Sequence, residues 1–65
     1  MSETERVRAV RQLWKEQYPE EDRRTGHNVL VFYEWLEQNR PDLLRGRGDS
    51  RFQRVKSDLT GLWKD

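Results

Sequence analysis

The sequence predicts an all-α protein, a small three-helix bundle with helices at about residues 3–18, 27–40 and 50–63. Apolar residues recur at three- and four-residue steps in each of these segments. Polar connections separate the segments, and no stretch shows the two-residue alternation of a half-buried strand. The whole chain, residues 1–65, is therefore predicted to form a single helical domain.

The first helix is predicted from its start signal and its apolar stripe. Ser2 and Glu5 have the spacing of a capping box, in which a Ser precedes the helix and a Glu occupies its third position. Pro19 disfavours helical geometry in the residue before it, so the helix should end near Tyr18. The stripe consists of Val7, Val10, Leu13, Trp14 and Tyr18.

The middle helix has more apolar residues than one neighbour can cover. Its apolar arc is about 200° wide, whereas a surface helix needs little more than about 100°. Such a helix is either central in the bundle or partly an interface. The residues of the arc are Val29, Leu30, Val31, Phe32, Tyr33, Trp35 and Leu36.

A short turn with Leu43 and Leu44 is expected to close the core before the third helix. Gly46 and Gly48 supply the backbone freedom for a chain reversal. Ser50 and Gln53 then repeat the capping-box spacing. The third helix should pack through an arc of about 100°, formed by Phe52, Val55, Leu59, Leu62 and Trp63.

Composition favours a folded chain of modest stability. Hydrophobic residues make up 32% and charged residues 38%, but three Trp, two Phe and two Tyr can bury much area in a small protein. There is no cysteine, so neither a disulfide nor a thiolate metal site is available.

The sequence predicts no enzyme, no catalytic residue, no cofactor and no metal. His27 is the one histidine, and it lacks the further ligands that a metal site needs. No Gly-rich phosphate loop occurs. A 65-residue bundle also offers little volume for the concave pocket that small molecules prefer.

A cytoplasmic location without membrane insertion is expected. Residues 1–5 contain neither the basic nor the apolar region of a secretory signal. The longest apolar run, residues 29–33, is far too short to cross a bilayer.

The leading functional hypothesis is protein–protein contact, as an adaptor, a regulator or a homo-oligomer. Leu30 and Val31 lie at the two edges of the wide apolar arc, with Tyr33 and Trp35 nearby. The predicted contact surface centres on Leu30, Tyr33 and Trp35. Aromatic residues dominate binding energy at many interfaces. Self-association would also relieve the small core of so short a chain.

The alternative is a DNA- or RNA-binding domain that resembles a helix-turn-helix. In that geometry, the start of the later helix reaches the bases and loop arginines hold phosphate. The formal net charge of +1 is low for such a domain, and an Arg54–Asp58 ion pair on a solvated helix explains part of the pattern equally well. The candidate residues are Arg45, Arg47, Arg51, Arg54 and Lys56.

Residues 46–50 read GRGDS, which resembles the cell-attachment motif of integrin ligands. The glycines suit a chain reversal, and Asp49 and Ser50 are preferred residue types at a helix start. The sequence therefore favours a loop between helices, and integrin attachment is not expected.

Overall fold

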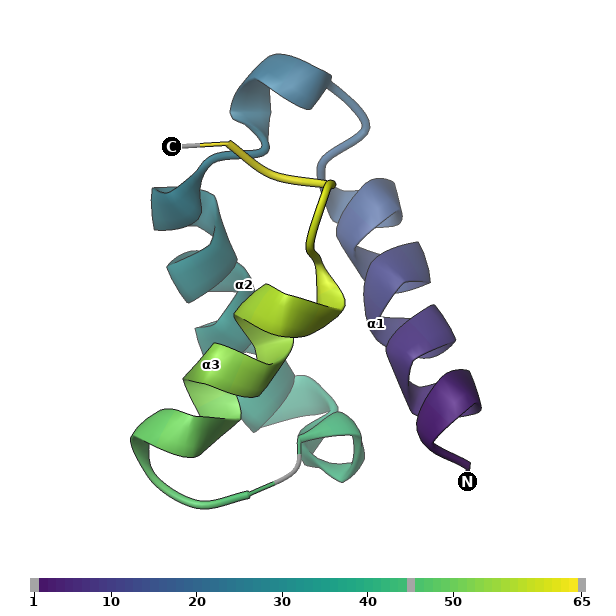
Figure 1. Ribbon diagram of the computed structural model, residues 1–65. Helices are drawn as coiled ribbons and strands as arrows, with labels where there is room; N and C mark the ends of the chain where they lie inside the picture. Colours follow the sequence, from purple (N-terminus) through teal and green to yellow (C-terminus); the bar gives the residue numbers. More distant parts are fainter. Residues whose placement is uncertain (1, 45, 65) are drawn as a thin grey trace.

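The predicted all-α three-helix bundle is confirmed by the computed structural model, which describes residues 2–44 and 46–64. Figure 1 shows α3 in front of α2, with α1 at the right, and α3 contacts both of the other helices. The described elements are α1 (Glu3–Gln17), the short 3-10 turn η1 (Glu21–Arg23), α2 (Gly26–Asn39), a second 3-10 turn η2 (Pro41–Leu43) and α3 (Asp49–Asp58).

Local capping sets the starts of the first two helices. The Ser2 Oγ accepts a hydrogen bond of 3.2 Å from the backbone N–H of Glu5, which confirms the predicted cap of α1. The Thr25 Oγ1 accepts one of 3.3 Å from the backbone N–H of Asn28 and caps α2 in the same way. Each cap satisfies one of the backbone donors that a helix start leaves without a partner inside the helix.

The core lies where the three helices and η2 meet. Leu43 is fully buried and Leu44 is 7% exposed, so the predicted closure of the core by this turn is confirmed. Half-buried aromatic and aliphatic side chains, including Tyr33 and Trp35, pack around the core. The buried apolar residues are Val10, Trp14, Val29, Phe32, Leu36, Leu43, Leu44, Val55 and Leu59.

The predicted extent of the third helix is wrong at its C-terminal end. α3 ends at Asp58, and Gly61 with a φ of 86° follows in a turn, a conformation that residues with a Cβ rarely adopt. The tail then crosses to the start of α2 (Figure 1). There the backbone N–H of Lys64 donates to the Arg24 carbonyl over 2.7 Å, and the Gly26 N–H donates to the Lys64 carbonyl over 3.1 Å. These bonds replace the helical bonds that a longer α3 would make.

The predicted Ser50 cap is also wrong. α3 begins at Asp49, and the capping residue is Gly48, which forms no side-chain cap. Gly48 has φ 56° and ψ −135°, a conformation that is open to glycine and not to residues with a Cβ. Because the chain reverses at Gly48, the helix begins one residue before Ser50. Ser50 therefore lies inside the first turn and does not cap it. The role expected of the glycines in this loop is therefore confirmed.

Candidate functional site

The outer side of α2 exposes aliphatic residues. Leu30 and Val31 are each 42% exposed, whereas Val29 and Phe32 on either side of them in the sequence are fully buried. Val31 was absent from the predicted contact surface, although the sequence places it beside the apolar stripe. The exposure of two adjacent large aliphatic residues makes this side of α2 the first candidate for a contact surface.

Tyr33 and Trp35 lie on opposite flanks of α2, because residues two apart are about 200° apart around a helix. Tyr33 meets the Phe52 ring of α3 edge-on, with centroids 5.4 Å apart. Trp35 stacks on Phe32, with centroids 6.2 Å apart and planes 7° apart. Both rings are half-buried. The three predicted residues therefore do not share one patch, since Leu30 lies towards Tyr33 and Trp35 lies beyond Val31.

Carboxylates follow the exposed aliphatic pair along α2. Glu34 and Glu37 are exposed, and neither forms an ion pair within the described part of the chain. Residues at these spacings from Leu30 project from the same side of a helix. We call Leu30, Val31, Glu34 and Glu37 the α2 outer face.

The basic candidates of the nucleic-acid hypothesis do not project as one group. Arg45 lies outside the described residues. Arg47 is exposed in the loop and Arg51 is half-buried. The Arg54 guanidinium lies 3.5 Å from the Glu3 carboxylate, and the Lys56 ammonium lies 5.5 Å and 5.3 Å from the ring centroids of Phe52 and Trp63.

A single basic surface is therefore missing from the described part of α3. Arg54 and Lys56 are two residues apart and project about 200° apart around the helix. The predicted Arg54–Asp58 pair is wrong, because both side chains take partners on α1. Phosphate binding along this segment stays a prediction that the geometry supports less than contact through α2.

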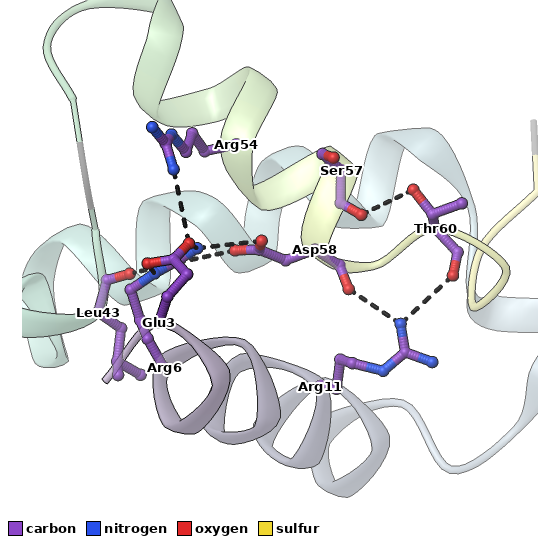
Figure 2. Close-up of polar contacts among 8 residues, drawn as sticks. All are labelled: Glu3, Arg6, Arg11, Leu43, Arg54, Ser57, Asp58 and Thr60. Carbon is purple, nitrogen blue, oxygen red and sulfur yellow. Dashed lines mark hydrogen bonds and ion pairs between the residues drawn. The ribbon is translucent and has the colours of Figure 1, made fainter. Parts of the chain in front are cut away.

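A buried arginine, which the sequence reasoning missed, joins α1 to the rest of the bundle (Figure 2). Arg6 is fully buried. Its Nη1 and Nη2 donate to the two Asp58 carboxylate oxygens over 2.7 Å and 3.1 Å, and Nη1 also donates to the Leu43 carbonyl over 3.0 Å. Its Nε and Nη2 donate to the two Glu3 carboxylate oxygens over 3.1 Å and 2.7 Å. All five N–H donors of the guanidinium are thus used.

This network is structural. The hydrogen bonds that the Arg6 guanidinium donates to Glu3, and after them those it donates to Asp58, hold its pKa above its usual range. A raised folded-state pKa on a basic group contributes stability that is present below the ordinary pKa and is lost only as the pH rises past the raised value. The contribution is therefore constant through neutral pH as far as this guanidinium is concerned. The sequence signal that could have indicated burial of Arg6 is its position on the helix. Arg6 precedes the buried Val10 and Trp14 by four and eight residues, which places it near the same face of α1.

A second arginine of α1 closes the end of α3. The Arg11 Nη1 donates to the backbone carbonyls of Asp58 and Thr60 over 3.0 Å and 3.3 Å, as Figure 2 shows. Carbonyls at a helix C-terminus lack partners inside the helix and attract cations. Arg11 is half-buried on α1. Its two hydrogen bonds to the end of α3 fix the direction of its side chain.

Other kinds of site have little support from the geometry. Among the described residues, no three His, Cys, Asp or Glu side chains are grouped so that they could hold a metal ion. None of the described helices has the length and apolar content needed to cross a membrane. His27 is exposed in the first turn of α2.

Comparison with protein-family models, with curated proteins and with solved structures found no match to this chain. Its function is therefore inferred from the side chains and their arrangement.

Proposed function

We propose that this protein is a small binding module that contacts another polypeptide through the α2 outer face. The observation that carries the proposal is the exposure of Leu30 and Val31 side by side, each at 42%, on a helix whose opposite side forms the core. Singly scattered aliphatic residues are common on protein surfaces, but two exposed large aliphatic residues about 100° apart on one rigid helix offer two apolar contact points to a partner.

The flanking side chains extend this contact. Tyr33 and Trp35 leave part of their rings accessible on either flank of α2. Both rings are fixed by aromatic neighbours in the bundle, Phe52 and Phe32, so they lose little freedom on binding. Covering the exposed parts of Leu30 and Val31 would contribute roughly 1 kcal/mol each.

The carboxylates indicate the chemistry of the partner. Glu34 and Glu37 lie on the same side of α2 as Leu30 and have no cation among the described residues to neutralise them. Complementary charge at an interface steers association and suppresses wrong partners. The expected partner surface is therefore apolar in its centre with Lys or Arg at one end.

Photo-crosslinking from α2 tests the proposal. Val31 is replaced by a photoreactive residue, and the protein is irradiated inside the cells that naturally produce it. Discrete adducts with a polypeptide are expected. Leu30→Lys in the same chain should abolish them, while its free energy of unfolding changes by only about 0.5 kcal/mol because the site is exposed. The readout is adduct mass together with a urea unfolding curve.

A matched probe at Glu16, which is exposed on α1, controls for random collisions. Equal labelling from both positions, or adducts that persist in the Leu30→Lys chain, would contradict contact through the α2 outer face.

A further inference from the structure

A hollow of about 430 Å³ lies along the outer side of α1. Val7 is half-buried in it, and Arg8, Arg11 and Lys15 line it together with the polar Thr4 and Gln12. We call the part of this surface formed by Val7, Arg8, Arg11 and Lys15 the α1 hollow. It combines an apolar contact point with three cations on a single rigid helix.

The cations of the α1 hollow differ in how they are held. Arg8 and Lys15 are exposed and form no ion pair within the described part of the chain. Both hydrogen bonds from Arg11 to α3 come from Nη1, and a guanidinium has five N–H donors, so Arg11 retains donors while α3 fixes its direction. Glu3, at the N-terminal end of the hollow, is neutralised by Arg6 and Arg54. The α1 hollow is therefore positively charged.

The α2 outer face has the complementary charges at matching distances. At 1.5 Å per residue, Glu34 and Glu37 follow Leu30 by about 6 Å and about 10.5 Å along α2. Arg11 and Lys15 follow Val7 by about 6 Å and about 12 Å along α1. Two helices laid side by side in the same direction would pair the aliphatic residues and then both charges in register.

We infer that the partner of the α2 outer face is the α1 hollow of a second copy of this chain. The inference rests on the proposed function, since it assigns the occupant of the surface described there. In this arrangement Leu30 and Val31 contact Val7, and Glu34 and Glu37 face Arg11 and Lys15. Arg8, next to Val7, adds to the positive charge that faces these carboxylates.

The two surfaces lie on different helices of the same molecule, and a single contact of one surface with the other is heterologous. A pair of copies joined by one such contact keeps a free α1 hollow on one copy and a free α2 outer face on the other, so association continues beyond a dimer with rising concentration. A single helix-on-helix contact is smaller than the about 1,200–2,000 Å² of a stable interface, so the association is weak.

Paired charge reversals test the inference by sedimentation velocity. One variant carries Arg8→Glu and Lys15→Glu, and the other carries Glu34→Lys and Glu37→Lys. From about 10 μM to about 1 mM, a range suited to a small interface, the parent is expected to sediment faster as concentration rises. Each variant alone should associate about tenfold more weakly. An equimolar mixture should recover association, because each variant offers the surface that the other has reversed.

Arg23→Glu with Arg47→Glu is the matched control, since it changes the net charge by as much as the α1 variant at exposed positions outside both surfaces. It should associate like the parent. A parent that stays monomeric throughout, or an α1 variant that associates as well as this control, overturns the inference. If either of those results is obtained but the photoreactive residue at position 31 crosslinks to a different protein, that protein is the partner and the proposed function stands. If those results are accompanied by an absence of Val31 adducts, the inference and the proposed function both fail.

Discussion

Replacing Arg6 with methionine is expected to lower the free energy of unfolding by about 3–5 kcal/mol, the usual cost of removing one partner of a buried ion pair. The Asp58 side chain is only 9% exposed, so its carboxylate would remain in the protein without its guanidinium. The Leu43 carbonyl would lose its donor as well. A domain of this size has roughly 3–5 kcal/mol of stability in total, so the variant should be largely unfolded at room temperature.

The same ion pair makes a second change informative. Combining Arg6→Met with Asp58→Leu removes both charges, and replacing a buried pair by apolar residues is often close to neutral. The double variant is therefore expected to recover most of the lost stability, as measured by the urea midpoint from circular dichroism. A loss below about 1 kcal/mol for Arg6→Met, or no recovery in the double variant, would show that the pair is not coupled in the way the geometry indicates.

Trp14→Ala is expected to cost about 3–5 kcal/mol, as truncation of a large buried aromatic side chain does. Trp14 is fully buried and lies between two rings, with centroids 4.6 Å from Tyr18 and 5.3 Å from Phe32. Its Nε1 also donates to the Leu62 carbonyl over 3.0 Å. The substitution therefore opens a cavity in the core and releases the tail that follows α3.

Trp35→Ala is the matched control for this prediction, because it truncates the same residue type on the half-buried flank of α2. It should cost clearly less, since Trp35 is only half-buried where it stacks on Phe32. Both variants can be compared by thermal unfolding with circular dichroism. Equal destabilisation would mean that Trp35 is as much a core residue as Trp14, and that it contributes little accessible surface to binding.

Much of the fold could be predicted from local patterns. The Ser2 cap and the stripe through Val10 and Trp14 predict α1, and the dense apolar run predicts α2, because both signals act between residues a few positions apart. The end of α3 could not be predicted in this way. Leu59 and Leu62 continue the helical spacing, yet the turn at Gly61 and the bonds of the tail to α2 prevail.

The candidate site was predictable in part. The wide apolar arc of α2 indicated that some of its residues reach the surface, and Leu30 does so. The helical period alone places Trp35 on the flank next to Val31 and away from Leu30, whereas the exposure of each side chain depends on where α1 and α3 lie. Contact through these residues stays a prediction.

By itself, the sequence determined the all-α class, the first two helices and the leucine turn that closes the core, because periodicity and capping are local properties of the chain. Only the tertiary structure decided that Arg6 is buried and that Asp58 pairs with it. These residues are 52 positions apart, so no local pattern links them. The pairing of Arg6 with Asp58 depends on the packing of α1 against α3. A charged group that is buried there is stable only beside a partner of opposite charge.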